Sequence, residues 1–360
     1  MIRKILMILM ALVLMLVPVC AYAEGDGTET AEQEVVEDIS ESFAVFFTAD
    51  VNGQLKGDKE HIGYSKLASL LAMQEESANL LVLDAGNALG KDDPDKVVKV
   101  MGATNCVAAG IGTRDAALGK DKLRELDAKA GFPLLCANWL RADGELYYQP
   151  YAVVEVGQLT IGIIGLISPE IKEMYPEETE NDNVYDPAPI ANIYYDEMME
   201  AGCDCFIALT SLGFEGEYTP DKLGLNCPWL DMILDSNTAE ADILNEGKLV
   251  EGTDTAVFNL ASDFKAMTVI QVTAGHYGYQ GLFPSTMTAA DFSDIPRDQG
   301  MEEFIDLDFS TFGEENGEGG GSVKTHRSLS NAQKFILLTL LITAIVVAVV
   351  VLVGKKKEKK

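Results

Sequence analysis

Histidine and basic residues are the scarce components of this sequence. The chain of 360 residues has 3 histidines, and its 27 lysines and arginines face 57 aspartates and glutamates, a formal net charge of -30. Few histidines limit metal chemistry, because multinuclear catalytic sites commonly take several ligands from imidazole rings. Few basic residues leave no positive face for a phosphate backbone. The composition therefore excludes nucleic acid from the expected partners.

The remaining composition is that of a folded protein. Hydrophobic residues make up 48% of the chain, enough for a packed core. Cysteine is sparse too, and apart from Cys20 most cysteines lie in apolar stretches, where small buried side chains are expected rather than a disulfide framework. These are Cys106, Cys136, Cys203, Cys205 and Cys227.

The N-terminus has the pattern of a secretory signal. Arg3 and Lys4 precede an uncharged apolar run, which ends before Ala21-Tyr22-Ala23, a small-x-small cleavage pattern. We therefore predict a signal peptide over residues 1–23. Two alternatives stay open: lipidation at Cys20, which the bulky Val19 disfavours, and an uncleaved anchor, for which the run is short.

The C-terminus has the pattern of a membrane anchor. Residues 335–353 carry no charge and are rich in Leu, Ile and Val, and a lysine-rich tail follows at 354–360. Such a run is long enough to cross a bilayer, and clustered lysines mark the cytoplasmic side. We predict a single-pass protein of the cell membrane, with an extracytoplasmic domain, a cytoplasmic C-terminus and the membrane as one partner.

Between the two ends, residues 42–312 are expected to form one ectodomain. An acidic lead-in at 24–41 precedes it, and a Gly/Glu-rich linker at 313–334 follows. Apolar runs alternate with helical patterns, which predicts an α/β fold, and the tight Gly157-Gln158 turn predicts a hairpin and so a mixed sheet. The expected strands are 43–49, 80–83, 106–109, 133–137, 152–156, 160–166, 205–209, 231–234, 256–260 and 268–273, and the expected helices are 64–74, 121–129 and 188–199.

Polar residues gather where the predicted strands end, which is the edge at which open α/β sheets bind ligands. These stretches are 48–55, 83–89, 109–115 and 208–213. Together with 63–68, 132–138 and 161–170, they make residues 43–283 resemble the 5'-nucleotidase and 2',3'-cyclic phosphodiesterase branch of the calcineurin-like metallophosphoesterases. The resemblance implies an αββα sandwich with mixed sheets.

The resemblance also implies a pair of divalent metals at the strand ends, but most ligand positions have changed. The first motif keeps Asp50 and has Asn52 in place of histidine, and Asn87 replaces the aspartate that bridges both metals. The other positions fall at Gly110-Ile111-Gly112-Thr113, at Ser211 and at about Ser236-Asn237-Thr238-Ala239, and none holds a histidine. His61, His276 and His326 fall on no ligand position of the family.

Loss of the bridging carboxylate removes the charge that offsets the repulsion between two dications. Loss of the histidine beside the phosphate removes an electrostatic contribution of roughly a hundredfold or more in rate. Asp50, Asn52 and Asn87 are thus remnants of a metal site. No cofactor is expected, and if one binds it is a divalent metal such as Mn, Zn, Mg or Ca. One alternative is an oxygen-only Ca²⁺ or Mg²⁺ site at Asp50, Asp84 and Asp115.

These residues favour a membrane-anchored phosphoesterase-like domain without catalytic activity, which binds a ligand or has a structural role. The alternative is an active metal-dependent phosphoesterase or nucleotidase with a reduced or rearranged site. A third hypothesis is a subunit of a catalytic or transporter complex. A small phosphorylated ligand or a membrane protein is the expected partner under these hypotheses.

Overall fold

The computed structural model describes residues 41–74, 79–90, 92–237, 244, 246–307 and 324–325. The predicted signal peptide, transmembrane helix at 335–353 and basic tail at 354–360 lie outside these residues, as do nearly all of the predicted lead-in and linker. Within the part of the chain that is described, no helix is both long and apolar enough to cross a bilayer.

The first sheet has six strands in the order β14-β13-β1-β2-β3-β4. Strands β1 to β4 run parallel, whereas β13 is antiparallel to β1 and to β14. The sheet is therefore mixed. Its strands are β1 (Glu41–Thr48), β2 (Asn79–Asp84), β3 (Cys106–Gly110), β4 (Leu134–Leu135), β13 (Ala266–Gly275) and β14 (Gly278–Thr288).

The second sheet has seven strands in the order β11-β12-β10-β9-β7-β6-β15. Its centre, β12-β10-β9-β7, is parallel, and β6 and β7 form the hairpin predicted at Gly157-Gln158. The strands are β6 (Tyr151–Val156), β7 (Leu159–Ile167), β9 (Cys205–Ser211), β10 (Met232–Asp235), β11 (Lys248–Leu249), β12 (Ala256–Asn259) and β15 (Lys324–Thr325). A small separate sheet pairs β5 (Trp139–Leu140) with β8 (Asn183–Val184).

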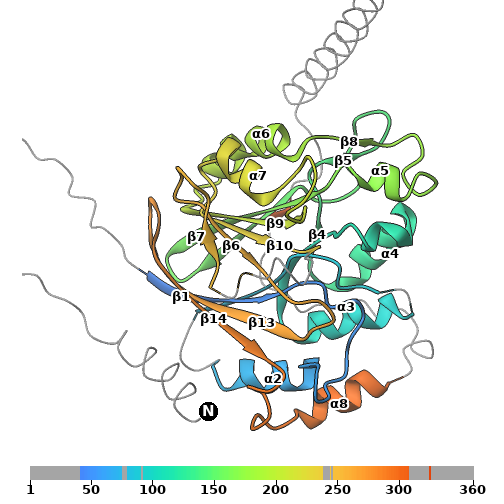
Figure 1. The fold of residues 1–360 in the computed structure, drawn as a ribbon, viewed down its shortest axis with the longest axis vertical. Helices are drawn as coiled ribbons and strands as arrows, with labels where there is room; N and C mark the ends of the chain where they lie inside the picture. The colour runs from blue at the N-terminus through green and yellow to red at the C-terminus, as the bar shows by residue number, and fades with distance from the viewer. Residues whose placement is uncertain are drawn as a thin grey trace, which may run out of the picture.

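Helices cover the outer faces of the two sheets, as Figure 1 shows with α6 and α7 on one side and α2 and α8 on the other. Along β1, Phe43, Val45 and Phe47 point into the core between the sheets, whereas Ala44 and Phe46 point toward the helices. Alternate residues face opposite sides of a strand, so a strand buried on both faces is apolar throughout. The helices are α2 (Tyr64–Ala72), α3 (Pro94–Ala103), the 3₁₀ helix η1 (Asp115–Leu118), α4 (Lys120–Ala130), α5 (Ile171–Met174), α6 (Pro187–Glu200), α7 (Pro220–Asn226) and α8 (Gln299–Asp306).

The predicted α/β fold with mixed sheets is confirmed. Every predicted strand and helix is present, with ends within about two residues of those expected. Cys136, Cys203, Cys205 and Cys227 are buried as expected, and Cys106 is partly buried.

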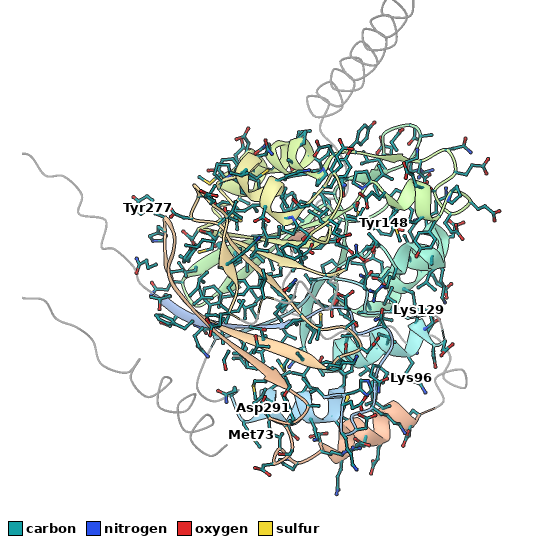
Figure 2. The ribbon with its side chains drawn as sticks, in the orientation of Figure 1. Met73, Lys96, Lys129, Tyr148, Tyr277 and Asp291 are labelled. Atoms are coloured by element: carbon teal, nitrogen blue, oxygen red, sulfur yellow. The ribbon has the colours of Figure 1, made fainter. Side chains whose placement is uncertain are left out.

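The β13 and β14 hairpin was predicted only in its first half. Strand β14 follows the exposed tip at Tyr277, where 91% of the residue is accessible (Figure 2). Gly281 and Pro284 interrupt the strand pattern of β14, but an edge strand tolerates both because one side of its backbone needs no partner.

Candidate functional site

The three remnant residues, Asp50, Asn52 and Asn87, lie together at the carboxyl ends of β1 and β2. Main-chain hydrogen bonds join the two loops, from Asp50 N–H to Gly86 O at 3.0 Å and from Asn52 N–H to Asn87 O at 2.9 Å. All three residues have positive φ, at 52°, 52° and 59°. Asp and Asn tolerate this left-handed conformation better than most residues. The local sequence thus suits the bend that brings their side chains together.

Asn87 is the centre of the hydrogen-bond network. Its Nδ2 donates to Asp50 Oδ1 at 2.7 Å and lies 3.5 Å from Ser211 Oγ. Its Oδ1 accepts from the Arg114 main-chain N–H at 2.8 Å. The oxygen and the nitrogen of this amide therefore both make hydrogen bonds, and the nitrogen, which faces Asp50, is the donor. An aspartate here would have no hydrogen to give.

Arg114 completes the site, although the sequence does not mark it as a site residue. Its Nη1 donates to Asn52 Oδ1 at 3.1 Å and lies 3.6 Å from Asp50 Oδ1, which is completely buried. The side chain of Arg114 is 41% exposed. Asn52 in turn donates from Nδ2 to Asp263 Oδ1 at 2.9 Å. The guanidinium therefore contacts one oxygen of the retained Asp50 and one of Asn52, which stands where the resemblance implies a histidine.

Three further carboxyls, those of Asp84, Asp115 and Asp235, bind the loops at the strand ends by accepting hydrogen bonds. Asp84 accepts from Thr48 and from Gly86 N–H, and Asp235 accepts from Thr210 and from two main-chain N–H groups. Asp115 accepts from the N–H groups of the loops at 87–89 and 112. Burial raises the pKa of all three, to about 8 for Asp84, about 6 for Asp115 and about 7 for Asp235, and nearby Asp50 adds to each rise.

The other expected ligand positions are joined by hydrogen bonds as well. Ser211 Oγ accepts from Thr113 N–H at 2.9 Å, so the positions predicted at 110–113 and at Ser211 contact each other. Asn237, from the position predicted at 236–239, donates its main-chain N–H to Asp50 Oδ1 at 3.1 Å, while residues 238–239 lie outside the described part of the chain. The strand ends thus meet where the sequence predicted, with amide and hydroxyl groups in place of imidazoles.

The described histidines lie elsewhere. His61 Nδ1 is 2.9 Å from Asp58 in a surface loop. His276 Nδ1 is 2.6 Å from Asp204, which directly precedes β9, whereas Ser211 ends that strand. His276 therefore lies at the opposite end of the second sheet from the site, and His326 is outside the described residues.

A metal pair does not fit this arrangement. Asn87 turns N–H hydrogens toward Asp50, and the Arg114 guanidinium already brings a positive charge beside it. Over the described residues, no group of three His, Cys, Asp or Glu side chains could hold a metal ion. The alternative oxygen-only site is therefore wrong for these residues: Asp84 and Asp115 accept main-chain N–H groups instead of converging with Asp50.

Comparison with known proteins defines the class. No family model matches the chain. In sequence, the chain is 26% identical over 278 residues to the trifunctional nucleotide phosphoesterase protein YfkN of Bacillus subtilis. The matched region covers 67% of this chain and 17% of that relative. The chain thus spans only a small part of the curated relative that it matches.

Solved structures show the same fold. The crystal structure of the calcineurin-like phosphoesterase YfkN from Bacillus subtilis superposes with a TM-score of 0.62 at 20% identity, covering 74% of this chain and 96% of that one. A 5'-nucleotidase precursor from Thermus thermophilus gives a TM-score of 0.62 at 19% identity, covering 73% of this chain and 57% of the other. The fold is that of the phosphoesterases. The resemblance predicted from the sequence is confirmed: the chain is similar in sequence to a nucleotide phosphoesterase and shares the fold of a calcineurin-like phosphoesterase and a 5'-nucleotidase.

Proposed function

We propose that this protein is a membrane-anchored phosphoesterase-like domain that does not hydrolyse phosphate esters, and that its role is binding or structural. The observation that carries this proposal is the closed network in which Asn87 donates to Asp50 and Arg114 lies across Asp50 and Asn52. In this network the groups that would hold a metal hold one another.

The charge around the site also argues against an anionic substrate. Asp50 and the carboxyls of Asp84, Asp115 and Asp235 surround the strand ends, and Arg114 is one cation among them. Because the raised pKa of Asp84 keeps that carboxyl mostly protonated near neutral pH, the negative charge that a phosphate ester would meet without metals comes chiefly from Asp50 and Asp115 and in part from Asp235. This favours an uncharged or cationic partner over the small phosphorylated ligand expected from the sequence.

The alternative function is metal-dependent hydrolysis of phosphate esters. It is supported by the retained Asp50 and by the likeness to a relative named as a trifunctional nucleotide phosphoesterase. For this function the loops would have to rearrange so that Asp50 exchanges its bond from Asn87 for a metal.

An assay of the purified full chain separates the two functions. We expect no release of phosphate from AMP, and no hydrolysis of a bis-aryl phosphate, in the presence of Mn²⁺, Zn²⁺ or Mg²⁺. Metal analysis by mass spectrometry should find less than one tightly bound transition metal per chain. Hydrolysis that the Asp50→Ala substitution abolishes would establish the alternative function instead.

Membrane anchoring through residues 335–353 is the second part of the proposal. Its support is the uncharged run and the lysines that follow it. The chain should remain with membranes after a high-salt wash, and protease added outside intact cells should remove residues 42–312. Release of the chain by salt, or protection from that protease, would contradict the anchoring or its orientation.

A further inference from the structure

The guanidinium of Arg114 lies beside the two residues at which the resemblance implies a divalent metal. It reaches Asn52 Oδ1 at 3.1 Å and Asp50 Oδ1 at 3.6 Å through the same nitrogen, Nη1. These two residues stand where the family's first motif supplies an aspartate and a histidine. One positive group therefore contacts both remnants of that motif.

The location of Asp50 explains why a cation is needed there. Its side chain has no exposed surface, and it lies near enough to Asp84, Asp115 and Asp235 for its charge to add to the raised pKa of each. A buried carboxylate is costly without a nearby opposite charge and hydrogen bonds. Asn87 and Asn237 supply hydrogen bonds to Asp50, and Arg114 supplies charge.

The main chain fixes Arg114 in place. Its N–H donates to Asn87 Oδ1 at 2.8 Å, directly before η1 begins at Asp115. Asp115 accepts from the N–H of Asn87 at 2.8 Å and of Gly112 at 2.9 Å. Arg114 and its neighbour Asp115 are therefore both bound to Asn87 in the adjacent loop, and the bond from Gly112 to Asp115 holds the arginine's own loop.

We propose that Arg114 is a resident cation that replaces a divalent metal at Asp50 and Asn52, so that Arg114 and Asn87 together exclude metal from a site that would otherwise accept it. This inference rests on the proposed non-catalytic function and deepens it, because it names the two residues that keep the site from binding metal. It predicts that metal binding returns only when both are changed.

The test compares the full chain with Asn87→Asp, with Arg114→Ala and with the double substitution. The Tm of each is measured with and without about 1 mM Mn²⁺, since a ligand that binds only the folded state raises Tm. We expect a rise of about 5 °C for the double variant, and none for the unchanged chain or for Asn87→Asp alone. Calorimetric titration with Mn²⁺ should show a saturable site in the double variant alone.

Arg124→Ala is the matched control for loss of an arginine. Arg124 lies on α4 with 52% of its side chain exposed, and its ion pair with Asp121 is long, at 3.9 Å. Without added metal, Arg114→Ala should lower Tm by several degrees and Arg124→Ala should leave it unchanged. If Arg114→Ala does not fold, Arg114→Lys takes its place: it keeps the positive charge, and its Tm should lie close to that of the unchanged chain.

Each outcome decides the inference. A Mn²⁺ response in Asn87→Asp equal to that of the double variant would show that Arg114 excludes nothing. No response in the double variant would show that the arginine does not stand in for a metal, while leaving the lack of hydrolysis intact. A Mn²⁺ response in the unchanged chain would overturn the inference, and phosphate release in the separate assay would overturn the proposed function.

Discussion

Replacing Asp84 with asparagine removes a buried ionisable group while keeping its contacts. The Asp84 carboxyl accepts from Thr48 Oγ1 at 2.7 Å and from Gly86 N–H at 2.8 Å, and the residue is 1% exposed. An asparagine can accept from Gly86 through its oxygen and donate to Thr48 through its amide. Thr48 can then donate to the Leu83 carbonyl, which is already 3.4 Å from its hydroxyl.

The expected effect on stability depends on pH. Burial raises the pKa of Asp84 from 3.8 to about 8, and nearby Asp115 and Asp50 add to the rise. Between these two values the folded state binds more protons than the unfolded state, so the free energy of unfolding falls as pH rises. At roughly 1.4 kcal/mol per pKa unit, this one carboxyl lowers stability by on the order of 3 kcal/mol between about pH 5 and about pH 8.

Urea denaturation of the full chain at a series of pH values measures this effect. Asp84→Asn should unfold at a higher urea concentration than the unchanged chain near pH 8, and the difference should shrink toward pH 5. The matched control is Asp294→Asn, at an exposed position, which should leave the pH dependence unchanged. Equal pH slopes in the Asp84→Asn variant and the unchanged chain would refute a raised pKa at Asp84.

Two further substitutions test packing and charge by the same denaturation assay. Gly112→Ala should lower the free energy of unfolding by roughly 3 kcal/mol, because the new Cβ would lie 2.1 Å from Asn87 Oδ1. Gly131→Ala is the control: its Cβ would meet open space, so only the positive φ should lower the free energy of unfolding, by about 1 kcal/mol. Equal losses in the two variants would refute the close contact at Gly112. Asp182→Ala should lower the free energy of unfolding by about 3 kcal/mol, because this buried carboxylate accepts from an indole, a tyrosine hydroxyl and a lysine. Asp306→Ala is the control: it breaks an exposed ion pair and should lower the free energy of unfolding by under about 1 kcal/mol. A cost for Asp182→Ala as small as that of Asp306→Ala would contradict the buried network.

The strands were predictable because their signal is local. Runs such as 43–49 and 160–166 are apolar except for one threonine each, as expected for strands covered on both faces. Strand β14 was not predicted, because Gly281 and Pro284 weaken the local pattern and only its edge position makes them acceptable. Whether a strand lies at the edge of a sheet depends on how all the strands assemble, so a short stretch of sequence does not predict it.

The site was predictable in part for the same reason. Asp50, Asn52 and Asn87 follow strands directly, so their meeting at one sheet edge followed from the strand order. Arg114 and Asp263 were missed because neither stands at a ligand position, and Asp263 bonds to Asn52 across 211 residues of sequence. Their roles arise only from the meeting of loops that follow different strands.

The loops at the strand ends keep their shape through groups that are not metal ligands. Asp84 closes the turn at 84–86, Asp115 binds the loops at 87–89 and 112, and Asp235 binds the loop at 212–213, each by accepting main-chain N–H groups. Each buried N–H that they satisfy would otherwise cost stability. One set of residues therefore fixes the shape of the site, and under our proposal another set, Asn87 and Arg114, keeps a metal from binding there. Metal ligands can therefore change without disturbing the groups that shape the loops, which is consistent with a phosphoesterase fold that has Asn87 and Arg114 at its strand ends.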